Sequence, residues 1–299
     1  MYSDSDLAQQ SHRALAKIAA RPLATTDAGR LRSRGIIGFS RPVDTLPVSV
    51  TGPSCELNCA HCNAHYLAHM RPIDRVSDPK ALSLLVSGGC DRQGRVPLAD
   101  HLSSLATLSR GRRINCHAGF VDEETARSIA FYVDLISFDI VGDRETAREV
   151  YGLDVGLADY MAQYDMLSRH VRTVPHVTLG LRGGRFSGER AALDALSQRN
   201  PDTVVLIILI PTPGTRYAAC DPPPLDEVAT FFLEARDALP SSGLYLGCMR
   251  PAGRYRALVD DLAVRAGLDL VVNPARSAIA LARDAGLEIS WRQECCALD

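Results

Sequence analysis

The sequence contains very little lysine and few aromatic residues. Of its 33 lysine and arginine residues only Lys17 and Lys80 are lysines, and phenylalanine, tryptophan and tyrosine together make up 6% of the chain. Acidic and basic residues nearly balance, which gives a formal net charge of -2. A general nucleic-acid-binding protein carries a basic excess, so the composition argues against nucleic acid as a partner. We attribute the arginine bias mainly to codon usage, with anion binding by a few arginines as the alternative.

The chain also lacks a long apolar segment. Residues 1–20 are polar and amphipathic, without the apolar core of an export signal. The longest apolar run, TVVLIILIP at 203–211, is far shorter than the ~20 residues that a membrane-spanning helix needs. We therefore expect a cytoplasmic protein with no membrane association. In that compartment, nine cysteines are more often metal ligands or catalytic groups than disulfides.

No internal repeat and no low-complexity linker interrupts the 299 residues, a length that one α/β barrel can occupy undivided. Apolar residues make up 46% of the chain, enough for a sizeable core. We expect an N-terminal helical extension at 1–45, a barrel at 46–285 and a cysteine-bearing C-terminal tail at 286–299.

Short β-branched or apolar runs alternate with longer helical patterns along the chain. Strands are expected at 46–52, 82–89, 113–119, 134–140, 174–181, 203–211, 243–249 and 268–274. Helices are expected at 97–111, 122–133, 156–170, 188–199, 224–239, 256–267 and 274–286. Repeated strand–helix alternation predicts an α/β fold with parallel strands, and its count favours a full or nearly full (βα) barrel over an open sheet.

Three cysteines occur within eight positions of SVTGPSCELNCAHCNAHYL, residues 49–67. A C-x3-C-x2-C loop can bind three irons of a [4Fe–4S] cube and leave the fourth iron open, whereas four cysteines would saturate the cube. The alternative is a zinc site completed by a histidine of the same loop: His61, His65 or His69. We favour the cluster because structural zinc loops usually pair two knuckles, and no second knuckle of regular spacing is present.

The loop CELNCAHC, placed between a first expected strand and a helix in an α/β chain of this size, resembles the radical SAM superfamily. The resemblance implies a barrel of the radical SAM/TIM-barrel type and a [4Fe–4S] cluster on Cys55, Cys59 and Cys62. It also implies that S-adenosylmethionine binds the open iron and is reductively cleaved to the 5′-deoxyadenosyl radical, which abstracts hydrogen from a C–H bond.

The resemblance implies further contacts for S-adenosylmethionine. Gly88 and Gly89 would let the strand backbone approach the methionyl amino group, and the backbone at Gly180 would pass close to adenine. His61 would lie beside adenine, and Asp139 would bind the ribose hydroxyls. Each of three residues has an alternative interpretation. His61 could be a solvated loop histidine, Asp139 a helix-capping aspartate and Gly180 an ordinary strand glycine.

Other cysteines fall at expected strand ends or in the tail: Cys90, Cys116, Cys248, Cys295 and Cys296. Cys90 stands where many superfamily members carry an acidic residue. Cys90, Cys116 and Cys248, at different strand ends, resemble the arrangement in biotin synthase, in which inward-facing cysteines hold a second iron–sulfur cluster that donates sulfur. Cys295 and Cys296 in the tail would fold over the barrel mouth as ligands of an auxiliary cluster or as a sulfur relay. The alternatives are buried small hydrophobic residues and idle thiols at a frayed end.

A closer likeness, in CELNCAHCNAHYLAHM, LGCMRPAGRYR and the cysteine-bearing C-terminus, is to the radical SAM proteins of two-protein lipoyl synthases. It implies sulfur insertion into an octanoyl chain on a lipoyl-type carrier protein. A second radical SAM protein and an electron donor such as ferredoxin or flavodoxin would be partners. Two alternatives remain: a biotin-synthase-like enzyme with a small-molecule substrate and no sulfur insertion, and a metal- or redox-sensing protein with zinc or an iron–sulfur cluster.

Overall fold

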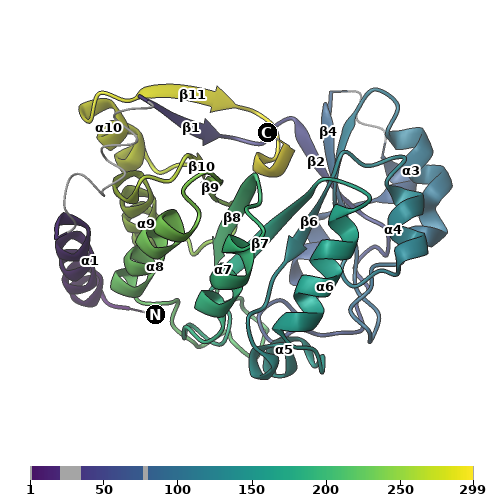
Figure 1. The fold of residues 1–299 in the computed structure, drawn as a ribbon, viewed down its shortest axis with the longest axis horizontal. Coiled ribbons are helices and arrows are strands. Elements are labelled where there is room, and N and C mark those ends of the chain that lie inside the picture. Colours follow the sequence, from purple (N-terminus) through teal and green to yellow (C-terminus); the bar gives the residue numbers. More distant parts are fainter. Residues whose placement is uncertain (1, 21–34, 77–79, 299) are drawn as a thin grey trace. The chain divides into compact units, whose positions relative to one another are not determined.

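The computed structural model describes residues 2–20, 35–76 and 80–298, which form two compact units (Figure 1). The first unit comprises Met1–Arg41, Val177–Pro211 and Ala219–Arg292. The second unit comprises Pro42–His176, Thr212–Ala218 and Gln293–Asp299. Strand β7 (Thr173–Leu179) runs from the second unit into the first.

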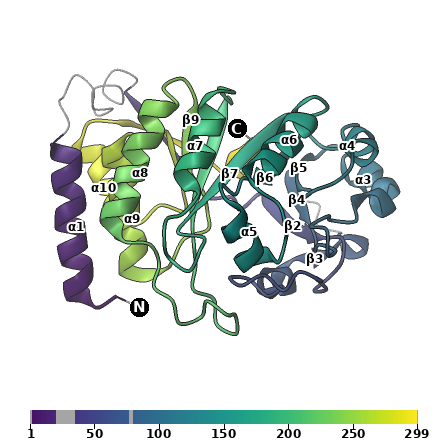
Figure 2. The same cartoon turned by 60° about the horizontal axis from the view of Figure 1, so that its bottom comes forward.

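The second unit is built on a parallel sheet with the strand order β3-β2-β4-β5-β6-β7. The strands before β7 are β2 (Thr45–Ser49), β3 (Arg71–Pro72), β4 (Ser83–Ser87), β5 (Arg113–His117) and β6 (Leu135–Asp139). The α-helices are α3 (Leu102–Leu108), α4 (Glu123–Ile129), α5 (Arg144–Tyr151) and α6 (Leu157–Ser168). Short 3-10 helices are η1 (His65–His69), η2 (Ile73–Arg75), η3 (Leu98–His101) and η4 (Cys296–Leu298). Figure 2 shows the strands side by side, with α3, α4 and α6 on the outside of the sheet.

The crossovers of the second unit begin at residues that favour helix starts. The side chain of Asp122 accepts a hydrogen bond from Thr125 N at 2.8 Å at the start of α4. Asp143 does the same for Thr146 N at 2.7 Å at the start of α5. Such caps satisfy amide groups that the first turn of a helix leaves unpaired. Helices α4 and α5 can therefore start a few residues after β5 and β6, as crossovers between parallel strands require.

The first unit has its own parallel strands, in the order β11-β1-β10-β9-β8. These are β1 (Ile36–Ser40), β8 (Thr203–Ile208), β9 (Gly243–Leu246), β10 (Leu270–Val272) and β11 (Glu288–Arg292). Its helices are α1 (Asp4–Ala19), α7 (Glu189–Ser197), α8 (Leu225–Ala238), α9 (Gly253–Ala266) and α10 (Arg276–Asp284). Helix α8 contacts α1, α7 and α9, and its Phe231 and Phe232 are fully buried.

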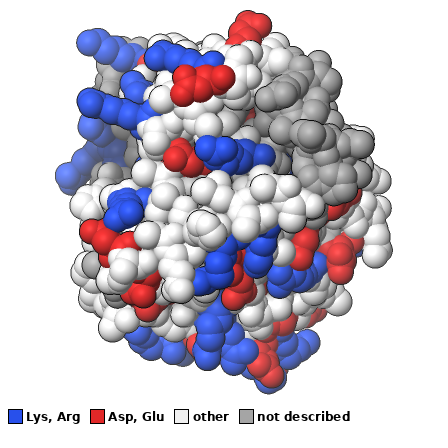
Figure 3. All heavy atoms as spheres, turned by 90° about the vertical axis from the view of Figure 1, so that its left-hand side faces the viewer, with Lys and Arg blue, Asp and Glu red and all other residues white. Residues whose placement is uncertain are grey.

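Helix α1 is attached to α8 by charged side chains. Lys17 Nζ donates to the Thr230 hydroxyl at 3.0 Å and lies 3.6 Å from the Asp226 carboxylate. Figure 3 shows this side of the molecule, where Lys and Arg are interspersed with Asp and Glu. Among the described residues, no helix is both long enough and apolar enough to cross a bilayer.

The expected α/β class with parallel strands and an N-terminal helix is confirmed. All eight expected strands are present, as β2 and β4 to β10, and the seven expected helices correspond to α3, α4 and α6 to α10. The sequence patterns missed β1, β3, β11 and α5. These elements are short, and β1 and β11 pair with each other although they lie near opposite ends of the chain.

Arg250 is fully buried in the first unit, although arginine side chains are usually exposed. Its Nε lies 2.6 Å from Asp260 Oδ1, and its guanidinium also donates to the carbonyl oxygens of Gly247 and Val272, each at 2.6 Å. The side chain therefore joins the ends of β9 and β10 to α9, and its hydrogen-bonding capacity is used inside the protein.

Replacing Arg250 with methionine should lower the free energy of unfolding by about 3–5 kcal/mol, because Asp260 is left as a buried charge without its partner. Urea denaturation followed by circular dichroism measures the change. Arg254→Met is the matched control, since Arg254 pairs with Asp4 at 2.9 Å on the surface, and its loss should cost less than about 1 kcal/mol. Equal effects of the two substitutions would contradict the structural role of Arg250.

Candidate functional site

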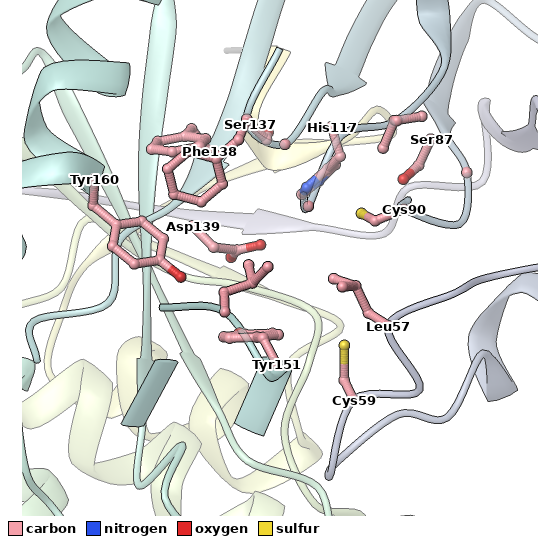
Figure 4. Close-up of a pocket in the computed structure, with 16 residues that line it drawn as sticks. Leu57, Cys59, Ser87, Cys90, His117, Ser137, Phe138, Asp139, Tyr151 and Tyr160 are labelled. Carbon is pink, nitrogen blue, oxygen red and sulfur yellow. The ribbon is translucent and has the colours of Figure 1, made fainter. Parts of the chain in front are cut away.

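A cavity lies in the second unit at the carboxyl ends of β4, β5 and β6 (Figure 4). Polar side chains from these three strand ends reach it: Ser87, His117, Ser137 and Asp139. Apolar side chains form much of the remaining wall: Leu57, Val96, Phe120, Phe138 and Leu153. The carboxyl ends of parallel strands are where α/β folds bind ligands, so the cavity is the candidate site.

The side chain of Cys116 does not reach this cavity. Successive residues of a strand point to opposite faces of the sheet, so Cys116 faces away from the cavity that His117 lines. Cys116 is fully buried, in register with Val86 and Ile136, and burial raises the pKa of its thiol to about 12. The structure does not bring Cys116 to the site.

The cysteine loop follows β2 and turns sharply. Asn58, Asn63 and Ala64 have φ values of 47°, 46° and 58°, in the left-handed region. Asparagine tolerates this region better than most residues. The carbonyl oxygen of Cys59 accepts hydrogen bonds from the amides of Cys62 (3.1 Å) and Asn63 (3.0 Å). These bonds hold the second and third cysteines on one tight turn.

The thiols of this loop influence one another. Burial raises the pKa of the Cys59 thiol, and the neighbouring Cys62, Cys55 and Cys90 raise it further. Burial also raises the pKa of Cys62, while backbone amides next to its sulfur, Ala64 first, oppose that shift. The raised pKa values disfavour loss of the thiol protons. Metal binding overcomes this cost, because a thiol loses its proton when it coordinates a metal.

The residues fit the donor set of an iron–sulfur cube. Within the described ranges, no three or more His, Cys, Asp or Glu side chains surround a single metal-ion position. A cube takes each thiolate on a different iron, which suits three cysteines spread along one loop. The backbone amides around Cys62 also favour its charged thiolate form, which is the form that binds a metal.

The glycine turn after β4 packs directly on the cysteine loop. A Cβ atom added to Gly89 would lie 1.8 Å from the Ser54 carbonyl oxygen and 2.6 Å from Cys55 Cα, so only glycine fits. The amide of Gly89 donates to the Thr51 hydroxyl at 2.7 Å. Gly88 lines the cavity from the same turn. The structure thus brings Gly88 and Gly89 to the cysteine loop.

Asp139 projects into the cavity from the end of β6 (Figure 4). Its carboxylate forms no hydrogen bond or ion pair with any residue that the structure describes. Tyr151 and Tyr160 also line the cavity, and burial together with the charge of Asp139 raises the pKa of both phenols. An unpaired carboxylate beside two neutral phenols favours a ligand that donates hydrogen bonds.

His61, in the cysteine loop, packs edge-on against Tyr151 with 5.7 Å between the ring centroids. Burial lowers its pKa to about 4, although Asp139 opposes the shift. Its Nδ1 is buried and has no hydrogen-bond partner among the described residues. An unsatisfied buried nitrogen is costly, so this atom also favours a ligand that would complete its hydrogen bonding.

The C-terminal cysteines lie at the opposite end of the strands of the second unit. The amide of Cys295 donates to the hydroxyl of Thr45, the first residue of β2, at 2.7 Å. Its sulfur accepts a hydrogen bond from Asn115 Nδ2 at 3.4 Å, and Cys296 is buried. The cysteine loop instead follows the carboxyl end of β2. The structure does not bring Cys295 and Cys296 to the cysteine loop.

Two predicted site residues belong to the first unit, and their roles stay predictions. Gly180 has a φ of +68°, and a Cβ there would lie 2.8 Å from the Pro223 ring. Cys248 is exposed, and its carbonyl oxygen accepts a hydrogen bond from Arg256 at 3.3 Å.

Sequence reasoning assigned no role to His117, His176, Tyr151 or Tyr160. The rings of His117 and His176 meet edge-on at 5.5 Å, and burial lowers the pKa of both. The position of His117 at the end of an expected strand was a usable signal. Tyr151 was harder to find, because it is the last residue of α5, which the sequence patterns missed.

Comparisons with known proteins support the fold. No family model matches the sequence, and no curated protein matches it. Among solved structures, methylornithine synthase (PylB) is similar over 97% of this chain and 91% of its own, with 12% identity and a TM-score of 0.62. The FeFe-hydrogenase maturase HydG from Carboxydothermus hydrogenoformans is similar over 88% of this chain and 70% of its own, with 16% identity and a TM-score of 0.59. At these identities the likeness shows a shared fold.

Gly89→Ala should lower the free energy of unfolding of the protein without its cofactors by about 1–3 kcal/mol, because the methyl group has to displace the Ser54 backbone. Gly156→Ala is the matched control in the same unit. Its Cβ would meet nothing closer than 3.6 Å, and its φ is -117°, so only the weaker N-cap preference of alanine is expected to count, at less than about 1 kcal/mol. Urea denaturation measures the free energy of unfolding of both variants. Equal values would contradict the close packing of Gly89 against Ser54.

The buried His176 should make stability depend on pH. Its pKa is lowered from 6.5 to about 4 by burial, with a smaller contribution from His117. Between these two pH values the unfolded chain binds a proton at this histidine and the folded chain does not. The free energy of unfolding therefore falls as the pH drops from about 6.5 to about 4, by up to about 3 kcal/mol.

Urea titrations of wild-type protein and His176→Gln across this range measure the effect, with the exposed His12→Gln as control. The wild-type and His12→Gln curves should run parallel. His176→Gln should lose part of the slope, and an unchanged slope would contradict the assignment.

Proposed function

We propose that this protein is a radical SAM enzyme whose second unit binds a [4Fe–4S] cluster through Cys55, Cys59 and Cys62. The observation that carries the proposal is the packing of the Gly88–Gly89 turn against this loop, beside a cavity at the strand ends. When bound, such a cluster supplies one electron to the sulfonium of S-adenosylmethionine, which splits into methionine and the 5′-deoxyadenosyl radical.

The protein's own residues supply contacts for S-adenosylmethionine. The backbone of Gly88 and Gly89 offers polar groups, without side chains in the way, to the methionyl end. The unpaired carboxylate of Asp139 accepts hydrogen bonds from the two ribose hydroxyls. The unpartnered Nδ1 of His61 then lies on the adenine side, as the family resemblance implies. These contacts satisfy groups that otherwise remain without partners.

The apolar wall serves the radical reaction by excluding water and holding its shape. The rings of Phe120, Phe138 and Tyr160 pack against one another in a triangle, with centroid distances of 5.7 Å (Phe120 to Phe138), 4.9 Å (Phe120 to Tyr160) and 6.1 Å (Phe138 to Tyr160). Interlocked rings of this kind are stiff. A dry, stiff wall limits the access of unwanted hydrogen donors while a carbon radical is present.

Sulfur insertion, the finer prediction, requires a second cluster. Cys116 faces away from the cavity, and Cys295 and Cys296 lie at the amino-terminal end of β2 and β5. The geometry of the second unit therefore supports a one-cluster radical enzyme better than a two-cluster one. Lipoyl synthesis on a carrier protein, with a second radical SAM protein as partner, is the second candidate; ferredoxin or flavodoxin would supply the electron in either case.

A triple substitution of Cys55, Cys59 and Cys62 by alanine tests the proposal on anaerobically reconstituted protein. Wild type should bind about four irons per chain and the triple variant almost none. After dithionite and S-adenosylmethionine are added, only wild type should release 5′-deoxyadenosine. Cys220→Ala, in the first unit, should behave as wild type.

The possible iron counts separate the candidates. About eight irons in wild type, falling to about four in the triple variant, would return sulfur insertion to first place. Wild-type protein that holds its cluster but forms no 5′-deoxyadenosine would refute the radical reaction and favour a sensing protein. Zinc in place of iron would favour the zinc site.

A further inference from the structure

Cys90 is the one cysteine outside the C-x3-C-x2-C motif that the described part of the second unit places against this loop. Its carbonyl oxygen accepts a hydrogen bond from the Glu56 amide at 2.9 Å, and Cys55 Sγ lies 3.8 Å from the same oxygen. The backbone of Cys90 is therefore bonded directly to the residues around the first cysteine of the motif.

The chain on both sides of Cys90 is held in place. Before it, Gly89 touches the backbone of Ser54 and Cys55 too closely to admit a side chain. After it, the Asp91 carboxylate accepts hydrogen bonds from the amides of Gln93 and Arg95, each at 2.9 Å. A residue fixed between two such anchors has little freedom to move away from the loop.

The side chain of Cys90 reaches the same cavity as Cys59. Both line it, and Figure 4 shows their two sulfur atoms approaching one space from different segments. The Cys90 thiol makes no hydrogen bond to the described residues. The second unit thus offers three thiols of one loop and a fourth thiol, that of Cys90, which shares a cavity with Cys59 and whose backbone contacts Cys55.

We propose that Cys90 is a fourth thiolate ligand, which binds the open iron of the cluster on Cys55, Cys59 and Cys62 and is displaced by S-adenosylmethionine. The inference rests on the proposed function. A thiolate is a soft ligand that binds iron well.

The exchange balances without another reactant. The iron–sulfur bond to Cys90 breaks, and bonds form from the iron to the amino nitrogen and the carboxylate oxygen of S-adenosylmethionine. The ammonium group has to lose one proton to bind, and the released Cys90 thiolate takes it up. No electron is transferred in this step.

Two consequences follow from a fourth ligand. All four irons are thiolate-bound before the substrate arrives, so mild oxidation does not release the fourth iron. S-adenosylmethionine must compete with an internal ligand, so its apparent affinity is lowered by the fraction of protein in which the iron is open.

Ferricyanide oxidation of anaerobically reconstituted protein, followed by electron paramagnetic resonance, tests the first consequence. Wild type without S-adenosylmethionine should form little of the [3Fe–4S] signal that marks loss of one iron, and Cys90→Ala should form at least tenfold more. Cys220→Ala should match wild type. Cys90→Ser, which keeps the size of the side chain and replaces the sulfur, should lie closer to Cys90→Ala.

Equilibrium dialysis tests the second consequence, with an expected dissociation constant for S-adenosylmethionine at least tenfold lower in Cys90→Ala than in wild type. Ready [3Fe–4S] formation by wild type would overturn the proposal, and so would unchanged or weaker binding by Cys90→Ala. Failure of Cys90→Ala to load a cluster, while it is folded by circular dichroism, would overturn it as well. A wild-type chain that binds no cluster would instead refute the proposed function.

Discussion

The close approach of two backbone segments, at Gly89 and Ser54, is the constraint on which the site depends. Strands β2 and β4 are neighbours in register, with Ser49 opposite Ser87, so the loops that follow them leave the sheet side by side. The absence of a side chain at Gly89 lets these loops touch. Any larger residue would separate the cysteine motif from the cavity, however well the strands were formed.

Alternation along β5 and β6 places the polar side chains and Cys116 on opposite faces of the sheet in the second unit. Asn115, His117, Ser137 and Asp139 share the face that looks inward, where Ser137 donates to Asn115 at 2.9 Å. Cys116 occupies the other face as a small buried hydrophobic residue. One shift of register would exchange these sets, so the pairing of β5 with β6 is as important to the site as any single side chain.

The sequence predicts the local parts of this architecture well. Apolar periodicity located the eight central strands, and the spacing of Cys55, Cys59 and Cys62 located the loop. It could not show the pairing of β1 with β11, because nothing local in 36–40 indicates a partner at 288–292. It also placed Cys295 at the wrong end of the strands, because a tail that follows a helix can turn toward either end. The contact with Thr45 that decides the matter spans 250 positions.

Residues 293–298 connect the end of the chain to the start of β5. Arg113, at the start of β5, pairs with Glu294 and donates to the Leu298 carbonyl oxygen at 2.7 Å. The second unit therefore includes residues that follow every segment of the first unit in sequence. In the first unit, β1 can pair with β11 only after nearly the whole chain has been synthesised. Neither unit is a continuous stretch that could be expressed by itself. Such long-range closure gives the chain a high contact order, which slows folding and makes the two units rely on one another's chain segments.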